Sequence, residues 1–263
     1  MFAKSKIYAR FVKIKRISAQ DRQQMFSVFE KYYSGTDFET FETDMQKKTG
    51  VILVRRREDK AIVGFTTVTE YYFIMPNGKP ACGVFSGDTI IQKEYWGSRV
   101  LQSRFFIYVL TKKVFSGRIP LYWLLISKGF KTYLLLANNF TDYHPHPKGR
   151  NANLSSIVEN YCDRLFPGVY NKETQLLDFG NEYQMLKGGV AEISDELKAE
   201  KPKVAFFEEK NPTWQRGTEL PCVGVLSYKM LFSYVFILSR KIWTSLEINR
   251  VSKKIFFVKA VKN

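Results

Sequence analysis

The sequence is poor in the side chains from which metal sites and disulfide frameworks are built. Its 263 residues include two histidines and three cysteines. Cys82, Cys162 and Cys222 are far apart and have neither CxxC spacing nor a His pair beside them. We therefore expect no metal site and no disulfide, as is typical of a protein in the reducing cytoplasm.

Long hydrophobic runs are also missing. A membrane span needs roughly twenty apolar residues in succession, and the nearest approach, residues 223–239, is interrupted by Lys229. Charged residues come before any apolar run at the N-terminus, so we expect no secretory signal. We predict a cytoplasmic protein that can also lie at the inner face of a membrane through its basic, aromatic tail, residues 240–262.

Acidic residues are scarce relative to basic ones. The chain has 25 Asp and Glu against 41 Lys and Arg, a formal net charge of +16. Such a surface attracts nucleic acid, acidic proteins, anionic lipid or phosphorylated cofactors. Nucleic acid is the weaker alternative, because no binding motif is recognisable and the basic residues do not concentrate on one predicted helix. A basic protein that binds nucleic acid or a membrane surface without catalysis stays open as the alternative function.

Hydrophobic residues make up 45% of the chain and aromatic residues 16%, which is enough for a substantial core. Apolar spacing and turn residues predict an α/β (α+β) fold. The predicted elements are, in chain order, a strand at 7–17, helices at 18–34 and 36–50, strands at 51–54, 61–73 and 81–91, a helix at 100–116, a strand at 121–126, helices at 131–140 and 153–166, and a strand at 204–207. The prolines in residues 143–147 exclude regular structure there.

The connection from the strand at 81–91 to the helix at 100–116 is a candidate anion site. Gly97 lies just before the helix, and successive backbone amides at a helix N-terminus point in one direction. The helix dipole adds partial positive charge, and Arg99 can donate to phosphate through its planar guanidinium group. The residues therefore favour binding of a phosphorylated ligand.

The order of elements over residues 7–140, together with residues 90–101, resembles the GNAT superfamily of acyltransferases. In that family a Gln/Arg-x-x-Gly-x-Gly/Ala loop wraps the pyrophosphate of coenzyme A. Gly97 matches the first glycine, whereas Arg99 stands where the second glycine or alanine is usual and Trp96 where a basic residue is common. GNAT-like synthases that take fatty acyl groups from acyl carrier protein, such as acyl-homoserine-lactone and N-acyl amino acid synthases, also relax this loop.

The resemblance implies a mixed, mostly antiparallel sheet with splayed central strands flanked by helices. Residues 1–147 would form the acyl-donor-binding core, and residues 148–263 would complete the sheet and the acceptor side. The donor would be acyl-CoA or the acyl-pantetheine of an acidic carrier protein, which a positive surface attracts. The acceptor would be an amine of an amino acid or of a peptide side chain, and the acyl group a fatty one. The chain would thus be an N-acyltransferase, with lipidation of a peptide as one variant.

The resemblance also implies site residues. The gap between splayed strands would hold the pantetheine arm. The expected donor-binding residues are Thr89, Ile90, Ile91, Trp96, Gly97, Ser98, Arg99, Val100, Arg104 and Ser127. Asp88 is the candidate general base, although it could instead cap the turn, and Ser86 or Tyr72 could donate protons. His144 lies in the proline-rich loop and has a side chain suited to proton transfer near neutral pH. Cys82 is interpreted as structural.

Overall fold

The computed structural model describes residues 6–75, 77–180, 185–186 and 192–230. The chain divides into two compact units, residues 1–226 and residues 227–263. The basic tail at 240–262 lies outside the described residues, as does most of the apolar segment at 223–239. Among the described residues, no helix has the length and apolar character needed to cross a membrane.

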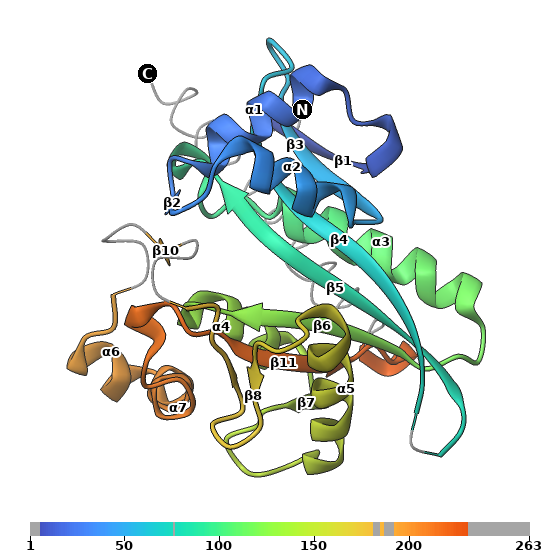
Figure 1. The fold of residues 1–263 in the computed structure, drawn as a ribbon, viewed down its shortest axis with the longest axis vertical. Helices are drawn as coiled ribbons and strands as arrows, with labels where there is room; N and C mark the ends of the chain where they lie inside the picture. The colour runs from blue at the N-terminus through green and yellow to red at the C-terminus, as the bar shows by residue number, and fades with distance from the viewer. Residues whose placement is uncertain (1–5, 76, 181–184, 187–191, 231–263) are drawn as a thin grey trace, which may run out of the picture. The chain divides into compact units, whose positions relative to one another are not determined.

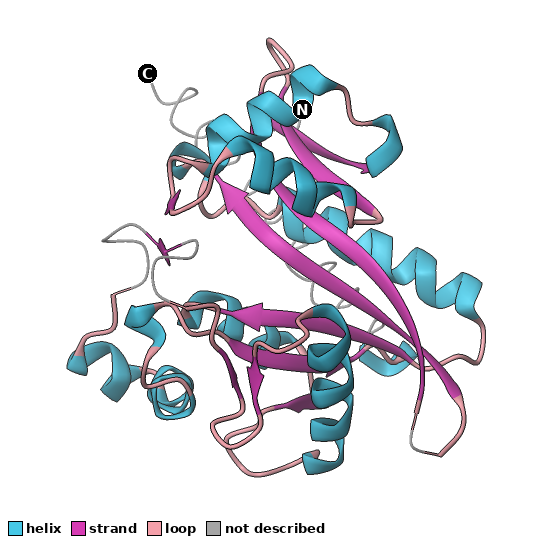
Figure 2. Ribbon diagram, viewed as in Figure 1, coloured by secondary structure: helices cyan, strands magenta, loops and turns pink. Residues whose placement is uncertain are grey.

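A seven-stranded sheet organises the first unit (Figures 1 and 2). Its strands, in spatial order, are β1 (Ile7–Lys13), β3 (Gly50–Arg56), β4 (Ile62–Ile74), β5 (Pro80–Ile91), β6 (Leu121–Ser127), β11 (Leu220–Val225) and β7 (Tyr143–His144). Neighbouring strands are antiparallel except for β5 and β6, which are parallel. Two small sheets pair β2 (Tyr33–Ser34) with β10 (Met185–Leu186), and β8 (Tyr170–Asn171) with β9 (Leu176–Leu177).

Helices flank the sheet on both faces (Figure 1). They are α1 (Ala19–Phe29), α2 (Phe38–Gln46), α3 (Val100–Ser116), α4 (Phe130–Asn139), α5 (Ser155–Leu165), α6 (Asp195–Glu200) and α7 (Pro202–Lys210). Short 3-10 turns span Ile14–Arg16, Lys93–Tyr95, Ala152–Leu154 and Trp214–Arg216. The predicted caps of the first two helices are confirmed: Ser18 Oγ accepts from the Asp21 amide, and Asp37 accepts from the Thr40 amide.

The alternation of side chains along β3 separates the two faces. Val51 and Leu53 pack in one core cluster with residues of α1 and α2, including Met25, Phe29 and Phe41. Val54 points to the opposite face and packs in a cluster with Leu101 of α3. The aromatic residues of α1 and α2 thus fill the core under these helices.

The C-terminal half of the first unit completes the same sheet. β11 lies between β6 and β7, so the sheet contains residues from both sides of position 147. α5 packs over these strands, where Tyr161 is fully buried. Its hydroxyl donates to the carbonyl of Leu125 in β6 at 2.9 Å and to that of Cys222 in β11 at 3.3 Å.

The prediction of a strand at residues 204–207 is wrong, because this segment belongs to α7. Pro202 stands in the first turn, where proline is favoured. Val204 and Phe207 are both fully buried and lie three residues apart on one helix face. A four-residue apolar run fits either element, and the sequence pattern could not distinguish them.

Two further boundaries differ from the sequence prediction. The first strand ends at Lys13, and residues 14–16 form a 3-10 turn. Tyr143 and His144, expected to be irregular, pair with β11 as a two-residue edge strand. A proline next to the strand is tolerated there because β7 is at the edge of the sheet.

We expect Tyr161→Phe to lower the free energy of unfolding by about 1 kcal/mol, because the variant loses a buried hydroxyl that bridges two strands. Urea denaturation would measure it. Tyr8→Phe is the matched control, since the Tyr8 hydroxyl has no hydrogen-bond partner among the described residues. Equal stabilities of the two variants would show that the bridge contributes nothing.

Candidate functional site

The parallel strands β5 and β6 separate along their length. They are paired from Cys82 opposite Leu121 to Ser86 opposite Leu125, and not beyond. β5 then continues to Ile91 paired with β4 alone, while β6 continues to Ser127 paired with β11. Backbone groups along the two facing edges are therefore left without a partner strand. The prediction of a GNAT-like, mostly antiparallel sheet with splayed central strands is confirmed.

A bulge in β5 lies where the strands begin to separate. Thr66 faces Thr89 and Val68 faces Ser86, so two residues of β5, Gly87 and Asp88, lie opposite Thr67 alone. A Cβ at Gly87 would lie 2.3 Å from Thr67 Oγ1, so the close approach of the strands requires glycine there. The bulge carries Asp88 into the space between the strands.

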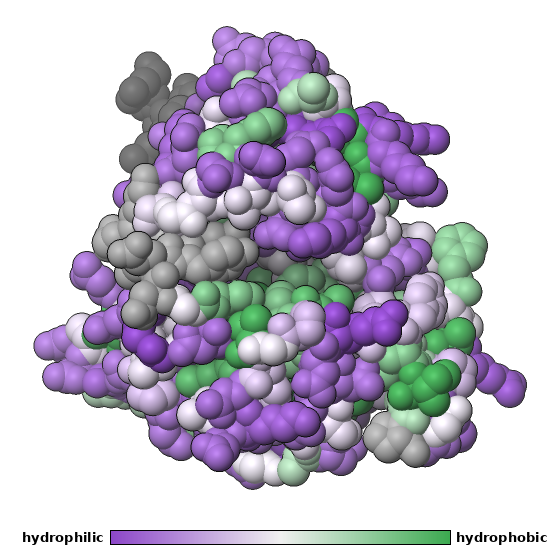
Figure 3. Space-filling view, viewed as in Figure 1, coloured by the Kyte–Doolittle hydropathy of each residue, from purple (hydrophilic) through white to green (hydrophobic). Residues whose placement is uncertain are grey.

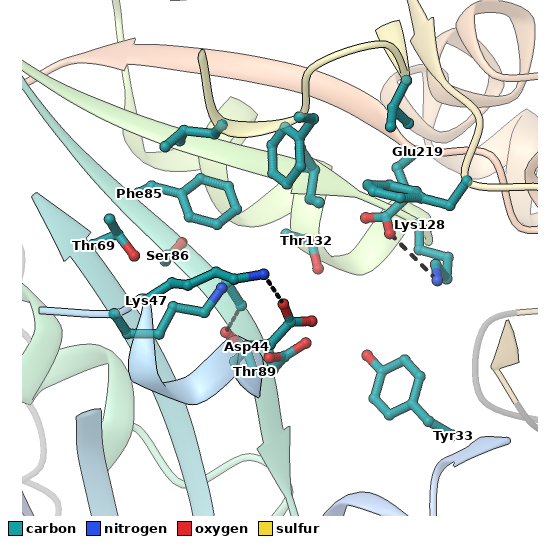
Figure 4. A pocket seen from close by; sticks show the side chains of 18 of the residues that line it. Tyr33, Asp44, Lys47, Thr69, Phe85, Ser86, Thr89, Lys128, Thr132 and Glu219 are labelled. Atoms are coloured by element: carbon teal, nitrogen blue, oxygen red, sulfur yellow. Dashed lines mark hydrogen bonds and ion pairs between the residues drawn. The ribbon is translucent and has the colours of Figure 1, made fainter. Parts of the chain in front are cut away.

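This space opens into a cleft of about 630 Å³ (Figure 4). In the view of Figure 3 the surface is hollowed between α2 and the β6 side of the sheet. Residues of α2, the diverging strands, the start of α4 and the segment after α5 line the cleft. Its aromatic wall is formed by Phe85, Phe166 and Phe179.

Asp88 is half-buried in the cleft. Burial raises the pKa of its carboxyl above the ordinary range, and nearby Asp44 adds to the rise. Lys48 and Lys128 oppose it. Among the described residues, the Asp88 side chain makes no hydrogen bond or ion pair with another side chain. Asp88 can therefore take up a proton at a higher pH than an exposed aspartate.

A buried ion pair lies on the β6 side of the cleft. Lys128 Nζ is 3.3 Å from Glu219 Oε1, and their side chains are 9% and 10% exposed. Burial raises the pKa of Glu219, the Lys128 charge lowers it, and the Asp88 charge raises it. The influence of Asp88 shows that the two carboxyl groups lie within electrostatic reach of each other.

Two hydroxyl groups also face the cleft. Tyr33 projects into it in Figure 4, and burial followed by the charges of Asp88 and Glu219 raises its pKa well above the ordinary value. Ser86 Oγ accepts a hydrogen bond from Trp123 Nε1 at 2.8 Å and keeps its own proton to donate. The cleft thus contains both proton acceptors and proton donors.

The loop before α3 has the backbone geometry expected of an anion site. Gly97 has φ +82°, and a Cβ there would meet no atom within 4 Å. Arg99 precedes the helix without capping it through its side chain. Trp96 donates to the Ile91 carbonyl at 2.8 Å, and Lys131 Nζ, from a residue that lines the cleft, lies 4.9 Å from the Trp96 ring centre. The start of α3 therefore lies near the rim of the cleft.

The structure brings only some of the predicted site residues together. Asp88, Ser86 and Thr89 line the cleft. Ile90 is buried in the core, and Ser127 is buried with its hydroxyl donating to the Gly129 carbonyl. The residues expected to hold phosphate, which do not themselves line the cleft, are grouped before and within the first turns of α3: Ile91, Trp96, Gly97, Ser98, Arg99, Val100 and Arg104.

Tyr72 and His144 lie away from the cleft. Tyr72 is 61% exposed and pairs with Cys82, where β5 and β6 are still joined. His144 is in the edge strand β7, where burial and the Lys210 charge lower its pKa. Neither side chain is placed to act on a ligand in the cleft.

Sequence reasoning missed Tyr33, Lys48, Lys128 and Glu219. Tyr33 matched the apolar spacing of α1, but α1 ends at Phe29 and Tyr33 belongs to β2. Lys128 follows directly after a predicted strand, which is a position that could have indicated a site. Glu219 carried no sequence signal. Among the described residues, no group of three or more His, Cys, Asp or Glu side chains could hold a metal ion.

No family model matches the chain, and no curated protein matches its sequence. Several solved structures do. A probable N-acyltransferase from Enterococcus faecalis matches with 14% identity and a TM-score of 0.38, over 50% of this chain and 32% of that protein. Glucosamine-6-phosphate N-acetyltransferase from Arabidopsis thaliana matches with 11% identity and a TM-score of 0.33, over 45% of this chain and 80% of that one. A GNAT family N-acetyltransferase from Escherichia coli in complex with CoA has 8% identity and a TM-score of 0.34, over 49% and 67%.

We expect Asp88→Asn to be more stable than the wild type at neutral pH. The raised pKa means that ionised Asp88 costs stability, fully relieved only below the ordinary value of 3.8 and incurred as the pH rises through the folded-state pKa. The advantage of the variant should therefore disappear in acid, as thermal unfolding from pH 3 to pH 8 would measure.

Asp59→Asn is the control of opposite sign. Its hydrogen bond with Arg56 lowers the pKa of Asp59 to about 2. Ionised Asp59 contributes stability above 3.8 that is lost as the pH falls toward 2, so this variant should be less stable at neutral pH. If both variants shift stability in the same direction, the environment of Asp88 is not the one described.

Proposed function

We propose that the protein is a GNAT-like N-acyltransferase that binds an acyl thioester in the gap between β5 and β6 and receives an amine from the cleft. The observation that carries this proposal is the separation of the two strands beside Asp88, a carboxyl group with raised pKa and no side-chain partner among the described residues. An extended pantetheine arm can hydrogen-bond to the unpaired edges as an additional strand would.

The start of α3 would hold the phosphate groups of the donor. Left-handed backbone at Gly97, the amides of the first helical turn and the exposed side chains of Lys93 and Arg99 supply donors and positive charge there. Coenzyme A and the phosphopantetheine of a carrier protein both present such phosphate.

A fatty acyl group is the finer part of the proposal. The aromatic residues of α1 and α2 are packed in the core, so they do not provide the tunnel that the resemblance implies. Phe85, Phe166 and Phe179 instead offer an apolar wall within the cleft. Each methylene buried on such a wall stabilises the complex by about 0.8 kcal/mol.

The residues of the cleft account for the proton transfers. The acceptor arrives as an ammonium ion, and Asp88 takes one proton, leaving a nucleophilic amine. The nitrogen forms a bond to the thioester carbon while an amide of the bulge can polarise the carbonyl oxygen. When the carbon–sulfur bond breaks, a second proton leaves the nitrogen and the thiolate is protonated, with Tyr33 and Ser86 as the nearest hydroxyl donors. The products are an amide and a free thiol.

We expect coenzyme A to raise the melting temperature of the wild type, because a ligand that binds only the folded state stabilises it. Gly97→Val should lose this shift, corresponding to donor binding at least about tenfold weaker, since the loop can no longer present its amides. Gly78→Val is the matched control: Gly78 has φ +76° and an equally open surrounding but lies in the β4–β5 hairpin. An unchanged shift in Gly97→Val would contradict the phosphate site.

A series of acyl-CoA thioesters from acetyl to palmitoyl tests the acyl group. If a fatty chain lies on the aromatic wall, stabilisation should grow with chain length, at equal ligand concentration. A plateau at acetyl would exclude a fatty donor. A mixed DNA oligomer that binds with a steep salt dependence, with no effect of any thioester, would instead favour the nucleic-acid alternative.

A further inference from the structure

Each wall of the gap carries one carboxyl group. Asp88 comes from the bulge of β5. Glu219 immediately precedes β11, whose first residue, Leu220, pairs with Ser127 at the end of β6. Both line the same cleft, and the pKa of Tyr33 responds to the charges of both. The separation of the strands therefore places two acidic side chains on opposite sides of one space.

Glu219 is held by Lys128. Burying a glutamate and a lysine costs more than their attraction returns in many proteins, so such pairs are weak stabilisers and often have another role. Lys128 contacts Oε1, and Glu219 has no other side-chain partner among the described residues. Lys128 thus fixes the glutamate and favours its ionised form while leaving its second oxygen for another donor.

The three groups Asp88, Glu219 and Lys128 together carry one negative charge when ionised. A cation entering between the carboxylates would neutralise that charge, whereas a neutral nucleophile would leave it uncompensated. Asp44 and Lys48 also lie beside Asp88, with opposite effects on it, and Lys47 is paired with Asp44. The local excess of negative charge is therefore confined to the two facing walls.

We propose that Glu219, positioned by Lys128, forms with Asp88 a clamp for the ammonium group of the acceptor, so that the site selects primary amines over neutral nucleophiles. This inference rests on the proposed acyltransferase function and assigns the acceptor side of it. Glu219 keeps its charge through Lys128 and binds the ammonium group, and Asp88 is the carboxylate that accepts its proton. Lys128 is a positioning residue.

Binding of a simple cation tests the clamp without requiring catalysis. n-Butylamine, which is protonated at neutral pH, and n-butanol have the same chain and differ in charge. In thermal-shift titrations of the full chain, we expect the amine to stabilise the wild type more than the alcohol does. Glu219→Gln leaves Lys128 buried without its partner and could fold poorly, so the decisive variant is the double substitution E219Q with K128M, which removes both charges.

The double variant separates a binding role from a structural one. If the ion pair only supports the fold, removing both charges should restore stability together with the preference for amine. If the clamp binds ammonium, the double variant should be stable, keep the coenzyme A shift, and bind the amine at least about tenfold more weakly. Glu173→Gln is the control for general charge effects, because Glu173 is exposed in the turn between β8 and β9 and loses the same charge.

Kinetics add a readout that a structural role would not change. With acyl-CoA as donor, the double variant should show a raised KM for n-butylamine and an unchanged KM for hydroxylamine, which is largely uncharged at neutral pH. Lys128→Arg should retain most of the amine preference, because arginine can still hold the glutamate.

The outcomes distinguish the clamp from the enzyme. Absence of an amine preference in the wild type, or its survival in the double variant, overturns the clamp whether or not coenzyme A binds. Loss of the coenzyme A shift in the wild type overturns the proposed function, and it leaves the amine titration to decide the clamp by itself.

Discussion

The end of pairing between β5 and β6 is the constraint on which the rest of this structure depends. Parallel strands normally continue side by side, because each unpaired backbone group inside a protein costs free energy. Here the ladder stops after Ser86 and Leu125, and each strand keeps its other partner, β4 or β11. The gap exists because both strands are anchored on their outer edges. Without that anchoring they would close on each other and no cleft would form between them.

The bulge gives the separation its chemistry. An extra residue in β5 turns Asp88 into the gap, and Gly87 makes the close approach to Thr67 possible. The same local irregularity therefore ends the ladder and presents a carboxyl group where it ends. On the other wall, the polypeptide entering β11 presents Glu219 at the corresponding edge, and Lys128 leaves β6 beside it.

The elements around the gap were predictable from the sequence because they depend on local signals. The helix at 100–116 has one apolar face and ends before Gly117, and the structure has it at the same residues. Gly97 was predictable because a tight turn before a helix favours glycine. Asp88 was identified because it lies in the same short segment. These features depend on residues that are close together in the chain.

The other half of the site could not be predicted, because it depends on contacts between distant segments. Glu219 reaches Lys128 only because β11 is inserted beside β6, and no periodicity in the sequence predicts which strand a short apolar segment joins. Tyr33 looked like the last apolar residue of a helix, whereas pairing of β2 with β10 fixes it in a separate element. Tyr72 and His144 were candidates on chemical grounds alone, and the sheet places both elsewhere.

The charge of the chain then has two separate uses. Its excess of +16 attracts an anionic donor over long distances, and exposed Lys93 and Arg99 stand beside the loop where phosphate would bind. Inside the cleft the balance is reversed over a short distance, because Asp88 and Glu219 face each other with one lysine held between them and solvent. A donor and an acceptor of opposite charge would therefore be drawn to different ends of the same gap. Because short-range charge is screened less in a buried site than at the surface, the cleft can hold a cation within a strongly basic protein.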